Sequence, residues 1–105
     1  MGMQEPENRV YLCGRLTRPP VFRGTPLGRE IADVFLAVSR GFGKSDYLPV
    51  IAWGRNARIV SGWQAGDRVE ATGRLQSRVY QKTLPDGTVT ERTAYEVSAT
   101  SIKRV

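Results

Sequence analysis

The chain has 105 residues, 40% of them hydrophobic and 25% charged, which is the length and composition of a single globular domain. It has no histidine and one cysteine, so we expect no metal site, no cofactor, no internal disulfide and no histidine base for catalysis. No apolar run approaches the ~20 residues of a membrane span. Residues 1–7 do not resemble a signal peptide, so we expect a cytoplasmic protein with no membrane partner.

Positive charge dominates the composition. There are 16 basic and 10 acidic residues, a net charge of +6, and 13 of the basic residues are arginine. Such a surplus attracts polyanions, and arginine adds planar stacking and paired contacts to phosphate. An ordinary basic surface explains the charge equally well, so the positions of the arginines have to decide between the two interpretations.

The first element is predicted after a short polar arm. Residues 1–8 include a proline and are predicted to be flexible, and one domain is expected over residues 9–105. The domain begins with alternating apolar and polar residues, which is typical of a half-buried strand. Tyr11 and Cys13 fall on the outer face of this strand, and an outer apolar face so early in the domain predicts subunit contact.

Two further strands are expected in the middle of the chain. Pro19-Pro20 interrupts the first strand, and residues 25–28 have the composition of a turn. A second strand is predicted over residues 29–39 and a third over residues 47–53, with a loop at residues 41–46. Aliphatic residues of one parity are predicted to fill the core. These residues are Ala32, Val34, Leu36, Val38, Leu48, Val50 and Ala52.

One helix and two more strands complete the pattern. The helix is predicted over residues 56–63, because Ile59, Val60 and Trp63 would share one face of it. We assign this apolar face, with Trp63, to the core.

A long fourth strand begins at Arg68, and Leu75 and Val79 have the parity of its core-facing residues. A turn at residues 84–87 leads to a fifth strand over residues 93–104. Five strands with one short helix between the third and fourth are the pattern of the OB-fold, a partly open Greek-key barrel. The predicted fold is therefore an all-β, five-stranded OB-fold barrel.

On the third and fourth strands, the residues at outward positions differ in chemistry from those at inward positions. Ile51 has the outward parity, but aromatic residues and arginines predominate there and in the adjoining loop. They are Phe42, Tyr47, Trp53, Tyr80, Arg40, Arg74 and Arg78. Bases stack on exposed rings while guanidinium groups neutralise phosphates, so this surface favours single-stranded nucleic acid. The roles of Phe35 and Tyr11 are left undecided, since each side chain suits a subunit interface and a base contact equally.

Several short stretches carry a family resemblance through their order and spacing. They are Asn8-Arg9-Val10, Gly14-Arg15-Leu16-Thr17-Arg18, Thr25-Pro26-Leu27-Gly28, Phe35-Leu36-Ala37-Val38, Pro49-Val50-Ile51-Ala52-Trp53-Gly54-Arg55, Gly66-Asp67-Arg68-Val69 and Gly73-Arg74-Leu75-Gln76-Ser77-Arg78. With them, residues 8–102 resemble the bacterial single-stranded-DNA-binding protein family. The resemblance implies an OB-fold protein, usually a homotetramer, that coats single strands at the nucleoid during DNA replication, recombination and repair.

The resemblance also implies a binding set. The family stacks bases at four positions, which fall here on Phe42, Tyr47, Trp53 and Tyr80. The matching stretches add two arginines, so the predicted DNA-binding residues are Phe42, Tyr47, Trp53, Tyr80, Arg15, Arg40, Arg55, Arg74 and Arg78. The expected partners are single-stranded DNA and further copies of the chain, as a tetramer or a dimer.

The chain departs from the family at its end. Family members continue into a flexible linker and an acidic tip that recruits replication proteins, whereas this sequence ends Ile102-Lys103-Arg104-Val105. A shortened sequence and a short paralogue both explain the difference, and recruitment through such a tip is not expected.

Two other functions compete with this interpretation. Gly43-Lys44-Ser45 resembles the end of a phosphate-binding loop, but Val38 stands where that motif needs glycine. Glu30 and Asp33 could share a metal, yet no third ligand is near them, so we predict no catalytic residues and no metal site. A primosome-type accessory OB protein, acting mainly through protein–protein contacts, stays open as the alternative because a fold does not define a function.

Overall fold

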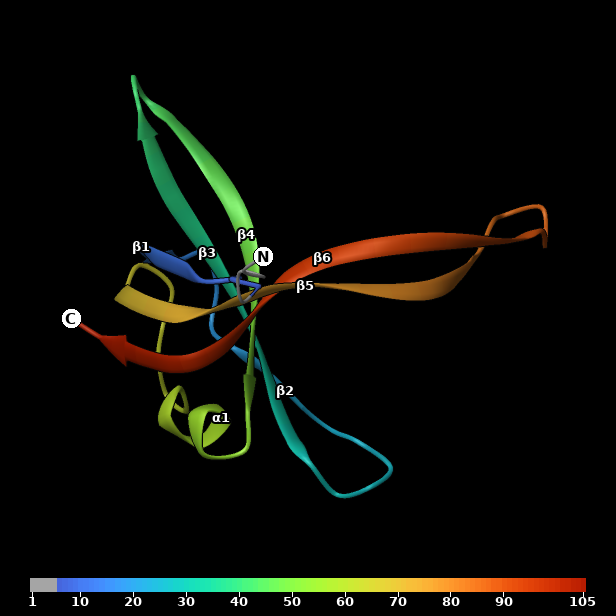
Figure 1. Ribbon diagram of the computed structural model, residues 1–105, viewed down its shortest axis with the longest axis horizontal. Helices are drawn as coiled ribbons and strands as arrows, with labels where there is room; N and C mark the ends of the chain where they lie inside the picture. The colour runs from blue at the N-terminus through green and yellow to red at the C-terminus, as the bar shows by residue number, and fades with distance from the viewer. Residues whose placement is uncertain (1–5) are drawn as a thin grey trace, which may run out of the picture.

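A computed structural model describes residues 6–105 of the chain (Figure 1). Within these residues the elements are β1 (Val10–Leu16), β2 (Val21–Gly24), β3 (Glu30–Gly41), β4 (Lys44–Trp53), α1 (Arg55–Ile59), β5 (Arg68–Thr83) and β6 (Val89–Arg104). In this part of the chain, no helix has the length and apolar character needed to cross a membrane. Most of the predicted flexible arm, residues 1–5, lies outside the described residues.

Five of the strands close into a barrel, which confirms the predicted OB-fold. The order of paired neighbours is β1-β5-β6-β4-β3, and β1 pairs with β3 at Arg15–Ala37 and Leu16–Leu36 to complete the ring. Gly14 allows this closure, because a Cβ atom there would stand 2.5 Å from the carbonyl oxygen of Ala37. The helix α1 follows β4 and covers one end of the barrel (Figure 1).

The strand β2 is not predicted by the sequence pattern. It pairs with the first residues of β3, with Val21 opposite Asp33 and Gly24 opposite Glu30. All four of its residues are exposed, because it lies at the edge of the sheet. A strand that buries neither face has no alternation of apolar and polar residues, and this is why the pattern does not reveal it.

The hairpin of β3 and β4 is longer than predicted, and the loop expected at residues 41–46 is mostly strand. β3 continues to Gly41 and β4 begins at Lys44, so that Phe42 and Gly43 form the turn. Their φ angles of 55° and 74° are typical of a two-residue type I′ turn, whose twist matches that of the strands. Phe42 therefore stands fully exposed at the tip of this hairpin.

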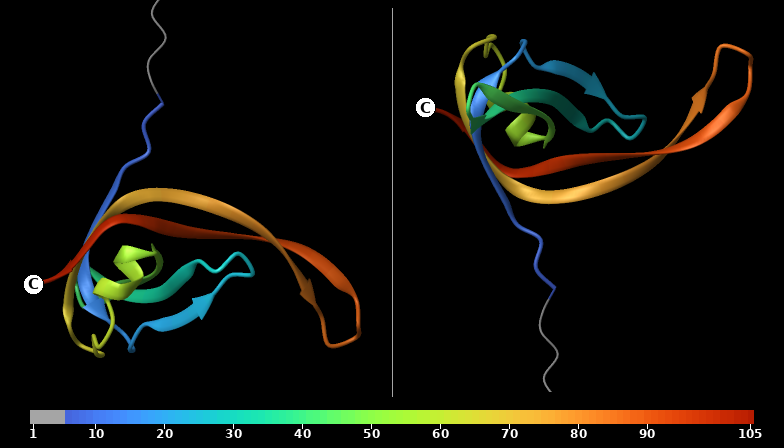
Figure 2. Two further views of the ribbon diagram at one scale, coloured as in Figure 1. Left: turned by 90° about the horizontal axis from the view of Figure 1, so that it is seen from below. Right: turned by 90° about the horizontal axis from the view of Figure 1, so that it is seen from above.

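The hairpin of β5 and β6 continues past the barrel as a two-stranded arm. Figure 1 shows the arm projecting from the barrel, and Figure 2 shows it curving over β2 and β3. Leu75 and Val79 have the parity predicted to fill the core, but they are 47% and 60% exposed. That prediction is wrong because the barrel ends where the arm begins, so the inward parity of the arm has no core to face.

Asn8 ties the start of the domain to the base of the arm. Its side-chain amide donates to the carbonyl oxygen of Leu75 at 2.6 Å, and its side-chain oxygen accepts from the Leu75 N–H at 2.8 Å. The ladder between β1 and β5 ends at Val10 and Gly73. The two hydrogen bonds of the Asn8 carboxamide therefore extend the β1–β5 ladder by one step beyond its last residue pair.

The core contains Trp63, which is 7% exposed, and most of the aliphatic residues predicted for it. Val38 is half-buried at the border of the core, and Leu48, also half-buried, lies outside it. The helix is shorter than predicted, because α1 ends at Ile59. Ile59 is exposed and does not belong to the core, whereas Val60 is completely buried. The left-handed φ of 83° at Gly62 cannot continue a right-handed helix, and so the predicted helical face is not formed.

Candidate nucleic-acid interface

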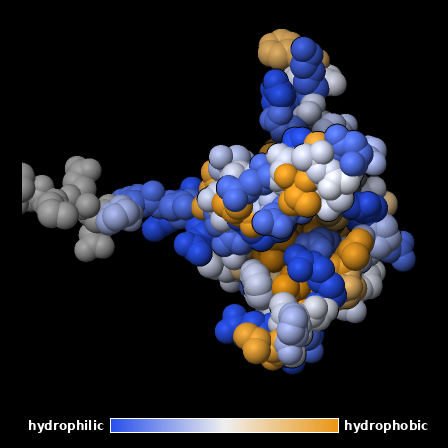
Figure 3. Space-filling model, turned by 90° about the vertical axis from the view of Figure 1, so that its right-hand side faces the viewer, coloured by the Kyte–Doolittle hydropathy of each residue, from blue (hydrophilic) through white to orange (hydrophobic). Residues whose placement is uncertain are grey.

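The outer faces of β2, β3 and β4 and the facing side of the arm enclose a groove of about 590 Å³. Figure 3, viewed from the side toward which the arm projects, shows apolar and polar surface mixed around the hollow beside the arm. The groove forms because the arm curves over the barrel (Figure 2).

The floor of the groove is apolar apart from Asp33, which stands opposite Ile51. Ile31 and Ile51 are almost completely buried there, and Trp53 stands opposite Ile31 in the β3–β4 ladder with 37% of its surface exposed. Phe35 and Pro49, which are also opposite each other, extend the floor. Ile51 has the predicted outward parity, yet it is only 4% exposed, and it lies at the floor of the groove.

Each side of the groove carries an arginine paired with a carboxylate, and on the barrel side the carboxylate belongs to the floor strand β3. On β2 and β3, Arg23 donates to both oxygens of Asp33, from Nε at 2.8 Å and from Nη2 at 3.2 Å. On the arm, Nε of Arg78 lies 3.5 Å from Oε1 of Glu96. The same oxygen accepts a hydrogen bond of 3.2 Å from the side-chain amide of Gln76. The Glu96 side chain is 8% exposed, so this wall is tightly built.

The charges of the two walls interact across the groove. The hydrogen bond with Asp33 raises the pKa of Arg23 above its ordinary value; desolvation opposes this, and the negative charges of Asp33 and Glu96 add to it. Arg23 therefore stays positive beside its partner. With two arginines and two carboxylates among its lining residues, the groove has no net charge.

A smaller pocket of about 350 Å³ continues from the groove along β4. Arg18 covers the ring of Phe35, with its guanidinium carbon 4.0 Å from the ring centroid. Tyr47 lines the same pocket. Since Phe35 lines both the pocket and the groove, the outer surface from Trp53 to Tyr47 is continuous, and Phe35 lies within it.

The structure brings some of the four predicted stacking residues together and separates others. Trp53 and Tyr47 lie on one face of β4, in the groove and the smaller pocket. Tyr80 lies in the arm, where its ring centroid is 5.5 Å from the guanidinium carbon of Arg78. Phe42 stands apart at the tip of the β3–β4 hairpin. Of the four, Trp53 lines the groove itself, so these residues do not form one compact patch.

The predicted arginines of the two hairpins have different surroundings. Arg78 lines the groove and is paired with Glu96. Arg74 lies nearer the barrel on the same strand, and its contact is with the side-chain oxygen of Gln76 at 3.5 Å. Arg40 forms an ion pair with Asp46 near the tip of the β3–β4 hairpin.

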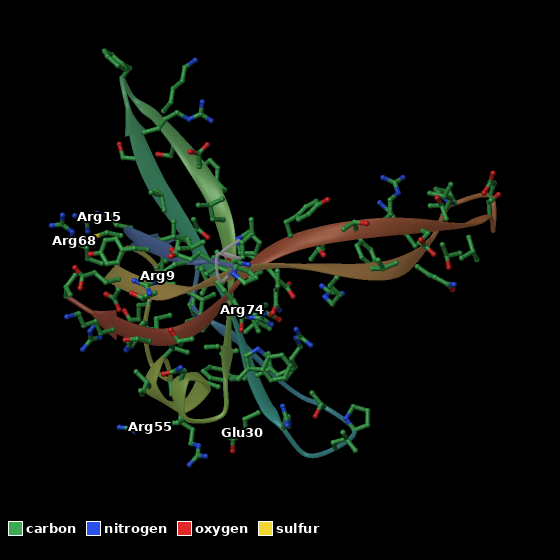
Figure 4. All side chains as sticks on the ribbon, viewed as in Figure 1. Arg9, Arg15, Glu30, Arg55, Arg68 and Arg74 are labelled. Atoms are coloured by element: carbon green, nitrogen blue, oxygen red, sulfur yellow. The ribbon has the colours of Figure 1, made fainter. Side chains whose placement is uncertain are left out.

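Arg15 and Arg55 do not join the groove. Arg15 stands opposite Arg68 in the β1–β5 ladder and donates to the carbonyl oxygen of Gly66 at 2.9 Å. Figure 4 shows Arg15 beside Arg68 at one side of the barrel and Arg55 at α1. Arg15 and Arg55 can contact DNA only if the bound DNA strand extends beyond the groove.

Four charged residues of the site are absent from the predicted DNA-binding set, namely Arg18, Arg23, Asp33 and Glu96. Asp33 has the outward parity of its strand, but the sequence suggested only a shared metal site for it. Arg23 lies on β2, which has no readable pattern, and Arg18 lies in the irregular segment that follows β1. Glu96 could be placed on the outer face, because it precedes the inward Val97 in the predicted fifth strand. Its burial could not be inferred, since that depends on the arm curving over the barrel.

The two acidic residues considered as a shared metal site have separate partners. Glu30 forms an ion pair with Arg58 at 2.9 Å, whereas Asp33 is bound to Arg23. Within residues 6–105, no group of three or more side chains is placed to hold a metal ion.

A closed OB barrel with an apolar outer groove, aromatic side chains and arginines defines the class of OB-fold domains that bind nucleic acids. In a comparison with protein families, residues 7–105 match the single-strand binding protein family. The chain belongs to this family.

Relatives and solved structures agree with this assignment. The chain is 39% identical to the single-stranded DNA-binding protein of Clostridium tetani, over 86% of this chain and 68% of that protein. It is 38% identical to single-stranded DNA-binding protein A of Bacillus subtilis, over 70% of this chain and 47% of that protein. The crystal structure of the wild-type single-stranded DNA binding protein from Thermus aquaticus matches with a TM-score of 0.76 and 30% identity, over 94% of this chain and 40% of that one.

Proposed function

We propose that this chain binds single-stranded DNA without sequence preference, and that it acts by binding and not by catalysis. The observation that carries the proposal is the continuous surface from Trp53 through Phe35 to Tyr47, with arginines beside it. Bases of any sequence can stack on such rings, because every base has a π-face. Membership of the family and the names of its relatives support this function.

The geometry suits a single strand and not a duplex. A duplex keeps the faces of its bases inside the stack, where the rings of Trp53 and Phe35 cannot reach them, and many duplex readers insert a helix into the major groove instead. The helix α1 has five residues and packs against the barrel. We therefore propose single strands as the ligand. Membership of the single-strand binding protein family supports a role in DNA replication, recombination and repair, and we propose the bacterial nucleoid as the location.

A fluorescence titration tests the proposal. A single-stranded oligonucleotide added to the chain should quench tryptophan emission to saturation, because a base stacks on Trp53. Two mixed sequences should give similar affinities, and a duplex of the same length should bind far more weakly. Absence of binding, or equal binding of the duplex, would contradict the proposal.

We also propose that the chain forms a homo-oligomer, a tetramer or a dimer. β1 pairs with β5 from Val10 to Arg15, but it pairs with β3 at Arg15 and Leu16 alone among the described residues. Its other edge is therefore open from Val10 to Gly14, and an open edge can pair with a strand of another copy. The outer face of this strand also exposes Tyr11. A monomeric mass in solution at micromolar concentration would contradict this proposal.

A further inference from the structure

The groove contains two carboxylates at the place where a polyanion is expected to bind. Glu96 lies 3.5 Å from Arg78 on the arm, and Asp33, which stands opposite Ile51 on the barrel side of the groove, lies 2.8 Å from Arg23. Both acids line the groove together with Trp53. The chain as a whole carries a net charge of +6, so the electroneutral groove differs from the average surface of the molecule.

This local neutrality determines which part of a nucleotide the groove can accept. A carboxylate repels phosphate and can only accept hydrogen bonds, while the apolar floor and Trp53 suit the face of a base. Arg74 lies on the same strand as Arg78, but it has no ion pair among the described residues. Arg74 is therefore free to contact phosphate, whereas the charge of Arg78 is already offset.

We propose that Glu96 and Asp33 are positioning residues that keep phosphate out of the groove. They hold Arg78 and Arg23 on its walls, so that bases enter the groove and stack on Trp53 while the phosphates pass outside. The inference rests on the proposed function, because it describes the path of a single strand through the same site.

The two acids also limit the affinity for DNA. A phosphate that approaches Arg78 has to displace a carboxylate that is nearly buried and additionally bound by Gln76. The counterion release that accompanies neutralisation of a phosphate is therefore not gained at this arginine. Removing the negative charge of Glu96 should free Arg78 to make that contact, and binding should become tighter.

The test compares Glu96→Gln with Glu70→Gln in the full chain. Glu70 accepts a hydrogen bond from Tyr11 at 2.6 Å, which the amide oxygen of Glu70→Gln can still accept, and forms an ion pair with Lys103 at 3.3 Å. It does not line the groove. The control thus removes the same charge and weakens one ion pair elsewhere. Affinity for a single-stranded oligonucleotide is measured by fluorescence anisotropy over a tenfold range of salt, and the melting temperature of each variant is recorded.

Glu96→Gln should bind more tightly than the wild type at low salt. Its slope of log affinity against log salt should be steeper by about 0.7, the value for one further phosphate on a single strand. Its advantage should therefore shrink about fivefold over the tenfold rise in salt. Glu70→Gln should keep the wild-type slope, and Asp33→Asn should behave like Glu96→Gln.

Two outcomes would overturn the inference. Weaker DNA binding by a folded Glu96→Gln variant would show that Glu96 holds Arg78 in position to contact DNA and does not exclude phosphate. An equal gain in DNA affinity in Glu96→Gln and Glu70→Gln would show that the effect comes from the net charge of the chain and not from the groove. If Glu96→Gln does not fold, Asp33→Asn decides by the same criteria. Failure of the wild type to bind any single strand would instead remove the proposed function.

Discussion

Trp53 and Trp63 lie on either side of the segment that contains α1, and they face opposite environments. Trp53 ends β4 and lines the groove with 37% of its surface exposed, whereas Trp63 is 7% exposed and packs in the core. They are the two tryptophans of the chain. Each can therefore report separately, one on the groove and the other on the fold.

Trp53→Phe should lose the fluorescence quench that single-stranded DNA produces, because a base stacks on this side chain. Trp63→Phe should keep most of the quench, since the core does not contact DNA. Both variants are measured by titration with the same oligonucleotide. A quench that disappears in Trp63→Phe and persists in Trp53→Phe would show that DNA does not bind at the groove.

Trp63→Ala should lower the free energy of unfolding by roughly 3–5 kcal/mol, the cost of truncating a core aromatic residue. Trp53→Ala and Tyr80→Ala should instead leave the fold intact and weaken DNA binding by about 1–3 kcal/mol, the range for one base–aromatic stack. Denaturant unfolding and DNA titration measure the two effects. The assignment of faces is wrong if Tyr80→Ala unfolds the chain and Trp63→Ala does not.

Arg74→Ala should make the slope of log affinity against log salt shallower by about 0.7, the value for the loss of one phosphate contact. Arg78→Ala should change the slope less, because Glu96 already offsets that charge in the free protein. Arg104→Ala is a matched control, since Arg104 is 3.5 Å from Asp67 at the barrel and does not line the groove. A wild-type slope in Arg74→Ala would place the phosphate contacts elsewhere.

Tyr11→Phe should raise the pKa of Glu70. In the wild type Tyr11 donates to Glu70 at 2.6 Å. This hydrogen bond, followed by that from Lys103, holds the pKa of Glu70 below its ordinary value of 4.5. Because the folded-state pKa is lowered, the stabilisation from ionised Glu70 is present above pH 4.5 and is lost as the pH falls through the folded value.

An NMR titration of the Glu70 side-chain carboxyl measures this shift. The pKa in Tyr11→Phe should move toward 4.5 but stay below it, because Lys103 remains as a partner. An identical pKa in the variant and the wild type would show that the tyrosine has no influence on the carboxylate.

The barrel strands are predictable because burial on one face leaves a period of two in the sequence. The start of β5 at Arg68, the turn at residues 84–87 and the core position of Trp63 are confirmed. The same period places Trp53 and Arg78 on the outward parity, and both line the groove. Their roles in DNA binding, and those of the other predicted site residues, stay predictions.

The sequence by itself determined the OB barrel, its family and the parity of the residues on its outer face, because these depend on local alternation and on short stretches in a set order. Only the tertiary structure decided that the arm of β5 and β6 curves over that face. Leu75 is exposed because the arm extends past the barrel, and the curvature of the arm brings Glu96 and Asp33 into one groove whose floor contains Ile51. No local pattern encodes such a contact, because it depends on how far a strand extends past the barrel and on which distant strand it then faces.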